Sequence, residues 1–128
     1  MKIKRVKIKI ESYQNFKEGV MDDFKRAQKR QPSRDANCDL VLSLPDLSYL
    51  GKIISVERLR LLKAIKDNRP ESIYQLAKLL NRTISNVQKD VAELAEYGII
   101  ELKKKRKKGQ KRETVEPHYK WDGFDIAV

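Results

Sequence analysis

Residues 55–100 decide the fold, and they read SVERLRLLKAIKDNRPESIYQLAKLLNRTISNVQKDVAELAEYGII. Apolar residues recur in this stretch at intervals of three and four, which is the spacing of one face of an α-helix. Three hydroxyl side chains suited to capping a helix N-terminus, Ser55, Ser72 and Thr83, each precede one such run. The stretch therefore predicts three successive helices.

The expected ends of these helices follow from local signals. The first helix, Val56 to Asp67, stops at Asn68-Arg69-Pro70 because proline cannot continue it. Ser72 and Gln75 have the spacing of a capping box, and Gly98 suits the position just past the end of the third helix. The side chains expected to face the core are Leu59, Leu62, Ile65, Ile73, Leu76, Ala77, Leu80, Ile84, Val87, Val91 and Leu94.

A β-hairpin is expected after the third helix. Ile99, Ile100 and Leu102 indicate a strand, the basic run with Gly109 indicates the tip, and the return strand reaches Val115 before Pro117. Three helices followed by a hairpin are the element order of a winged helix-turn-helix domain. We place this domain at residues 54–117, with the helix over residues 83–97 as its recognition helix.

The remainder is expected to form extensions of this domain. Residues 1–30 predict an arm with a strand, in which Val6, Ile8 and Ile10 share one face, and a helix from Ser12 to about Ala27. The apolar stripe of that helix needs a host, either the main domain or a second subunit. The stripe residues are Tyr13, Phe16, Val20, Phe24 and Ala27.

Residues 31–53 are interpreted as a linker that contains a short strand and a helical turn, broken by Gly51. Residues 118–128 are interpreted as a C-terminal strand extension with Phe124, Ile126 and Val128 on one face. The predicted fold class is mainly α with small β, an α+β protein.

The chain is strongly basic. It has 29 Lys and Arg against 18 Asp and Glu, a formal net charge of +11. Such an excess repels itself in a compact monomer and favours a polyanionic partner: nucleic acid, an anionic membrane surface or an acidic protein. No segment approaches the roughly 20 apolar residues that cross a bilayer, and the N-terminus lacks a signal-peptide pattern, so we expect a cytoplasmic protein without a membrane partner.

The third helix and the hairpin carry the residues expected to contact double-stranded DNA. A major groove is about 12 Å wide and admits one helix, in which Asn and Gln can pair with adenine and Lys with guanine or phosphate. Hydroxyl groups at helix starts can meet phosphate oxygens, and residues 103–112 add eight cations with no acidic residue between them. The expected DNA contacts are Ser72, Arg82, Thr83, Ser85, Asn86, Gln88, Lys89, Lys103, Lys104, Lys105, Arg106, Lys107, Lys108, Lys111 and Arg112.

Catalytic and metal-binding chemistry is not expected. The only histidine, His118, stands in an expected loop, and the neighbouring carboxylates Asp22 and Asp23 point to different sides of a helix. Cys38 is the only cysteine, which excludes an intrachain disulfide and a cysteine-based zinc site. We therefore expect no enzyme activity, no metal and no cofactor.

Several stretches resemble a family of small archaeal and bacterial predicted transcriptional regulators with a MarR-like winged helix. They are SVERLRLLKAI (55–65), RPESIYQLA (69–77), NRTISNVQKDV (81–91) and LAEYGII (94–100), and more loosely residues 119–128. The resemblance implies DNA binding by the helix after Thr83 and by the wing, as a dimer. It also implies a toxin as partner, because some relatives look like antitoxins. This chain departs from the family at two places: the family often has His and Arg where Gln88 and Lys89 stand, and its wing is usually less basic.

Three functions follow from these observations. The leading one is a sequence-specific transcriptional regulator that binds double-stranded DNA as a homodimer. The second is a non-specific architectural DNA-binding protein that uses the lysine cluster, and the third is an antitoxin-like protein-binding module. RNA binding is disfavoured because the basic run lacks interleaved aromatic residues for base stacking.

Overall fold

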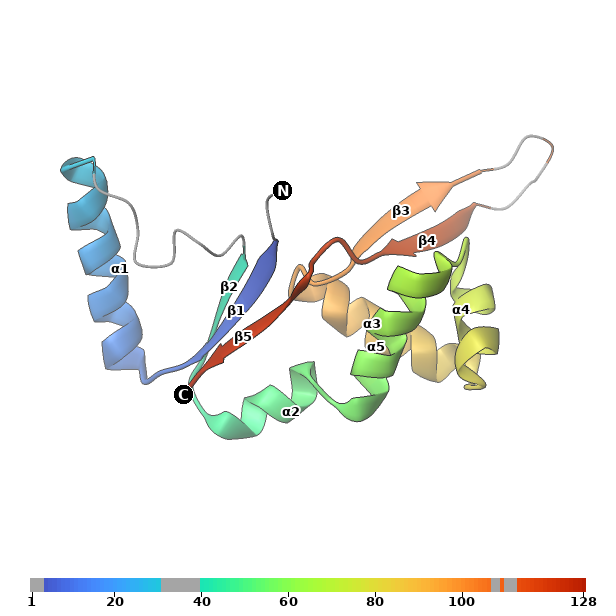
Figure 1. Ribbon diagram of the computed structural model, residues 1–128, viewed down its shortest axis with the longest axis horizontal. Coiled ribbons are helices and arrows are strands. Elements are labelled where there is room, and N and C mark those ends of the chain that lie inside the picture. The colour runs from blue at the N-terminus through green and yellow to red at the C-terminus, as the bar shows by residue number, and fades with distance from the viewer. Residues whose placement is uncertain (1–3, 31–39, 107–108, 110–112) are drawn as a thin grey trace. The chain divides into compact units, whose positions relative to one another are not determined.

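The protein is of the α+β class, and the structure, a computed structural model, describes residues 4–30, 40–106, 109 and 113–128 (Figure 1). The chain divides into two compact units: a sheet unit (residues 1–52 and 121–128) and a helical unit (residues 53–120). In order, the elements are β1 (Arg5–Ile10), α1 (Tyr13–Gln28), β2 (Leu40–Leu44), the 3-10 helix η1 (Leu47–Tyr49), α2 (Leu50–Ile53), α3 (Val56–Asn68), α4 (Ile73–Leu80), α5 (Ile84–Glu96), β3 (Glu101–Lys105), β4 (Thr114–His118) and β5 (Gly123–Ala127). Cys38 lies outside the described residues.

The three helices of the helical unit begin where the capping residues predict. Ser55 Oγ accepts a hydrogen bond from the Arg58 amide at 3.2 Å, and Ser72 Oγ accepts one from the Gln75 amide at 3.1 Å. The expected capping box is only half formed, because Gln75 Oε1 accepts from the amide of Glu71 at 3.0 Å, one residue before the cap. That bond satisfies a neighbouring amide instead.

The end of α5 also agrees with the sequence. Gly98 has a φ of 81°, a conformation that costs a residue with a side chain energy. The Ile99 amide donates to the Leu94 carbonyl at 3.0 Å and the Gly98 amide to the Ala95 carbonyl at 3.0 Å, which is a Schellman motif. This arrangement ends the helix and turns the chain toward β3.

Of the side chains expected in the core of the helical unit, Ile73 and Leu80 are only half-buried and two others are exposed. Leu59 is 43% exposed and Ile84 is 45% exposed, whereas both were expected to face inward. Leu61 is fully buried in place of Leu59, since the buried face of α3 is turned by part of a helical turn. The buried apolar residues of this unit are Ile53, Leu61, Leu62, Ile65, Pro70, Leu76, Ala77, Val87, Val91, Leu94, Ile99, Ile100 and Pro117.

An antiparallel hairpin of β3 and β4 follows α5, and its β4 strand contacts α3 and α4 (Figure 1). The prediction that the return strand ends before Pro117 is wrong, because β4 continues to His118. Pro117 pairs in register with Leu102 and is buried, which a strand in a two-stranded sheet permits since its outer edge needs no donor. His118 therefore lies in a strand and not in a loop.

The sheet unit joins the two ends of the chain. β1 is the middle strand of a parallel sheet in the order β2-β1-β5, and Val6 pairs with Leu40 of β2 and Phe124 of β5. Val6 and Ile8 are completely buried, as the alternation predicts. The stretches expected to be a separate arm, a linker strand and a C-terminal extension thus form one sheet. Pairing across such a separation leaves no local signal.

Two other expectations concern the helices around this sheet. Gly51 was expected to end a helical turn, but it lies within the helix α2.

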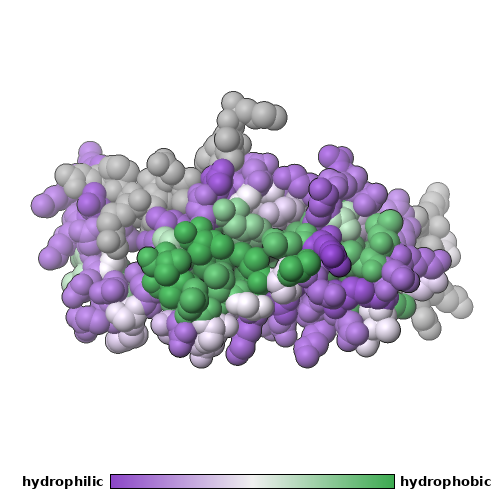
Figure 2. Space-filling model, turned by 60° about the horizontal axis from the view of Figure 1, so that its bottom comes forward, coloured by the Kyte–Doolittle hydropathy of each residue, from purple (hydrophilic) through white to green (hydrophobic). Residues whose placement is uncertain are grey.

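The helix α1 begins after Ser12 as predicted, yet its apolar stripe is exposed within the described part of the chain. Phe16 is 43% exposed and Tyr13 is 76% exposed. Figure 2 shows a face of the molecule on which apolar surface, in green, is surrounded by hydrophilic surface, in purple. In the part of the chain that is described, no helix is long and apolar enough to span a bilayer.

Candidate nucleic-acid interface

The N-terminal half of α5 presents a polar edge to solvent. Thr83 Oγ1 accepts from the Asn86 amide at 3.4 Å and fixes the first turn. Val87, Val91 and Leu94 are buried and anchor the opposite face of the helix. The helical repeat therefore leaves the predicted contact residues Ser85, Asn86, Gln88 and Lys89 exposed.

The preceding turn holds α5 against α4. Asn81 adopts the left-handed conformation with a φ of 53°, which asparagine tolerates better than most residues. Its amide donates to the Lys78 carbonyl at 3.2 Å, and the Arg82 amide donates to the Ala77 carbonyl at 3.1 Å. Only Asn81, Arg82 and Thr83 separate the two helices, so the orientation of α5 depends on this short turn.

Arg82 was predicted to contact DNA, but the structure engages it with carboxylates of the protein. Its Nη2 lies 2.9 Å from Oδ2 of Asp90, and its Nε lies 3.1 Å from Oε2 of Glu57. Asp90 is only 17% exposed, so its carboxylate needs a cationic partner. Arg82 therefore connects α3 to α5 and helps to orient α5.

A second arginine completes this cluster. Arg58 of α3 is 8% exposed, forms an ion pair with Glu93 and lies 3.5 Å from Oδ1 of Asp90. Arg58 is not among the predicted site residues, although a signal existed: it stands four residues before Leu62 and seven before Ile65, on the buried face of α3.

The hairpin carries the second group of predicted contacts. Every side chain of β3 is exposed, including Lys103, Lys104 and Lys105, and Arg106 follows at the surface. Lys107, Lys108, Lys111 and Arg112 lie outside the described residues.

Lys105 also stabilises the hairpin itself. Its Nζ lies 2.9 Å from Oε2 of Glu116 on β4, and Thr114 Oγ1 donates to the Lys105 carbonyl at 3.1 Å. The hydrogen bond from Lys105 lowers the pKa of the Glu116 carboxyl below its ordinary value. Glu116 Oε1 also lies 2.9 Å from Nε2 of His118.

Ser72 is the remaining predicted contact, and it lies at the N-terminus of α4, where it caps the helix. The structure thus places the exposed residues of α5 and the lysines of the hairpin on one unit. These amide, hydroxyl and ammonium groups can donate hydrogen bonds to base edges or phosphate oxygens.

The fold and this surface define an α+β protein whose helical unit ends in a basic hairpin. The chain belongs to the HVO_A0114 family, whose model matches residues 53–126 and therefore more than half of the chain. The match begins where the helical unit begins and ends within β5. Comparisons with curated proteins and with solved structures gave no match.

Proposed function

We propose that the protein is a transcriptional regulator that binds double-stranded DNA through a MarR-like winged helix-turn-helix. In this proposal α4 and α5 form the helix-turn-helix, α5 is the recognition helix, and the β3–β4 hairpin is the wing. The N-terminal half of α5 enters the major groove and the wing lies along the backbone or in the minor groove. No catalytic step is part of this function.

The observation that carries the proposal is the exposure of Asn86, Gln88 and Lys89 on a helix whose other face is buried. Asn and Gln are the side chains that pair with both adenine groups in the major groove, and each such pair discriminates between bases by about 1–3 kcal/mol. The exposed lysines of β3 and the net charge of +11 supply the sequence-independent attraction to phosphate.

The protein acts as a homodimer in this proposal. Each chain has one recognition helix, and two of them reach successive major grooves when they are about 34 Å apart. The exposed apolar stripe of α1 supports association with a second chain, because such surface is seldom left open on a monomer.

Selection of bound sites from random duplex DNA tests the proposal. We expect a palindromic or pseudo-palindromic consensus, and Asn86→Ala and Gln88→Ala should each weaken binding to it about 5-fold or more while leaving non-specific binding unchanged. Lys89→Ala is compared with Lys63→Ala, which removes the same charge from an exposed position of α3.

Two outcomes would contradict this function. Diffuse protection of any sequence would favour a non-specific architectural protein, provided that Asn86→Ala binds duplex DNA as tightly as the native chain and that neutralising Lys103, Lys104 and Lys105 flattens the salt dependence. An absence of duplex binding in dilute salt, with co-purification of a second protein, would favour an antitoxin-like protein-binding function.

A further inference from the structure

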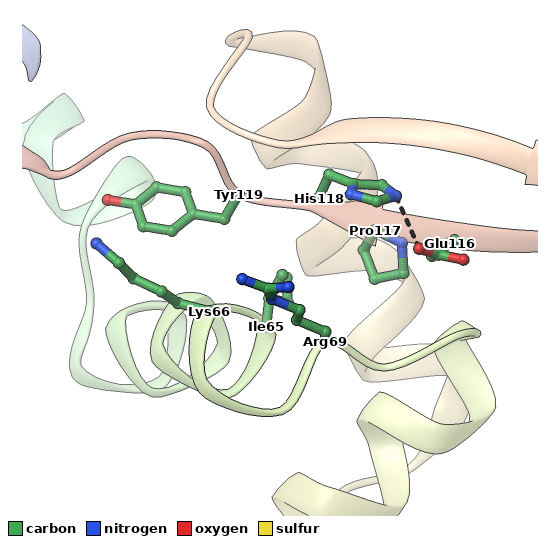
Figure 3. Close-up of a pocket in the computed structure, with 7 residues that line it drawn as sticks. All are labelled: Ile65, Lys66, Arg69, Glu116, Pro117, His118 and Tyr119. Carbon is green, nitrogen blue, oxygen red and sulfur yellow. Dashed lines mark ion pairs between the residues drawn. The ribbon is translucent and has the colours of Figure 1, made fainter. Parts of the chain in front are cut away.

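A groove in the helical unit lies outside the surface assigned to DNA. It has a volume of about 410 Å³ and is bounded by the last turn of α3 and by β4 with the residues after it. This volume is within the range of small-molecule sites, about 300–1,000 Å³. Figure 3 shows Ile65 on α3 and Pro117 on β4 among the charged and polar side chains that line the groove.

The polar side chains of the groove are mainly cationic. Lys66 Nζ lies 5.8 Å from the centre of the Tyr119 ring, and Figure 3 shows the Lys66 amine and the Tyr119 hydroxyl at the same end. The Arg69 guanidinium lies between that end and His118 (Figure 3). No carboxylate of the described residues pairs with Arg69, whereas the nearby Glu116 carboxylate is engaged by Lys105 and His118.

The backbone of Arg69 adds an independent observation. Arg69 has a φ of 46° and a ψ of 60°, a left-handed conformation that glycine or asparagine adopts more readily. An arginine in this conformation is uncommon, and such outliers concentrate at functional sites. The C-terminal end of α3 therefore has an arginine at a position where glycine or asparagine would adopt the backbone conformation more easily.

We propose that this groove binds a small organic anion, a phosphate or a carboxylate with an apolar body. Arg69 and Lys66 bind the anionic group, since a guanidinium presents paired donors to carboxylate and phosphate oxygens. Ile65 and Pro117 contact the apolar body. The ligand also adjoins β4, whose Glu116 is bonded to Lys105 on β3, so occupancy affects the hairpin. Binding itself does not depend on the proposed DNA-binding function.

The test is a titration of the full chain with phenyl phosphate and with phenylacetate, followed by amide chemical shifts in NMR spectra. Benzyl alcohol is the neutral control, and sodium chloride at equal ionic strength controls for screening. We expect saturable chemical-shift changes confined to residues 65–69 and to Glu116, His118 and Tyr119. The anion that binds with the higher affinity identifies the preferred anionic group.

Arg69→Gly is the decisive variant, because glycine suits the left-handed backbone and the variant should fold at least as well. It should weaken anion binding about 10-fold or more, Arg69→Lys should weaken it less, and Lys63→Ala should leave it unchanged. Shifts spread over exposed lysines, or equal affinity in Arg69→Gly, would overturn the proposal. So would a loss of duplex binding in Arg69→Gly without anion binding by the native chain, which would assign Arg69 to DNA. The anion titration contains no DNA, so failure of the regulatory function would leave its outcome intact.

Discussion

Replacing Asp90 with asparagine will destabilise the helical unit, because Asp90 connects two arginines of a largely buried cluster. Its carboxylate lies 2.9 Å from Arg82 and 3.5 Å from Arg58, and its side chain is 17% exposed. Removing one partner of a fully buried ion pair costs about 3–5 kcal/mol. Here Glu57 and Glu93 remain as partners of the two guanidiniums, and the asparagine oxygen still accepts one hydrogen bond. We therefore expect a loss of about 2 kcal/mol in the free energy of unfolding, which is the value of a hydrogen bond to a charged group.

Glu57→Gln is the matched control, since it removes a carboxylate from the same Arg82. The Glu57 side chain is 59% exposed, and exposed pairs contribute about 0–1 kcal/mol because water and salt screen them. Urea unfolding followed by far-UV circular dichroism measures both variants. If Asp90→Asn and Glu57→Gln lose the same free energy, burial is not the source of the stabilisation and the reasoning is refuted.

Three further predictions concern local features of the same unit. Thr83→Ala removes the cap of α5 and should lower the free energy of unfolding by about 1 kcal/mol in the same urea assay, whereas Thr83→Ser should nearly restore it. Gly98→Ala places a side chain at a φ of 81° and should cost about 1–2 kcal/mol; a neutral result in thermal unfolding would show that the turn relaxes. Lys105 lowers the folded-state pKa of Glu116, so this carboxylate stabilises the hairpin above the ordinary glutamate pKa of about 4.3, and the stabilisation is lost as the pH falls through the lowered value. Hydrogen exchange of the β4 amides should show that loss in the native chain and not in Glu116→Gln, and equal acid sensitivity in both would contradict the assignment.

The candidate site was partly predictable because its signals are local. Ser55, Ser72 and Thr83 cap helices as expected, since each hydroxyl bonds an amide three residues along the chain. The exposure of Asn86 and Gln88 follows from the burial of Val87 and the helical repeat. Residue type and spacing contain this information without any knowledge of the rest of the fold.

The ion pairs of Arg82 could not be predicted from the local sequence. Its position before the third helix predicts a DNA contact, and no local signal indicates its ion pairs with Glu57, 25 residues earlier in the chain, and with Asp90. The predicted burial of Leu59 and Ile84 is wrong for a similar reason. An apolar residue at the edge of a helical stripe is buried only if a neighbouring element covers it.

The sequence by itself determined the helices α1, α3, α4 and α5, because capping, periodicity and helix termination act within a few residues along the chain. Only the tertiary structure decided that β5 pairs with β1, that β2 joins them in a parallel sheet, and that Lys66 and Arg69 of the α3 end share a groove with Tyr119. These arrangements bring together residues far apart in the chain, and such contacts form only when the packing of whole elements offsets the entropy of closing long loops.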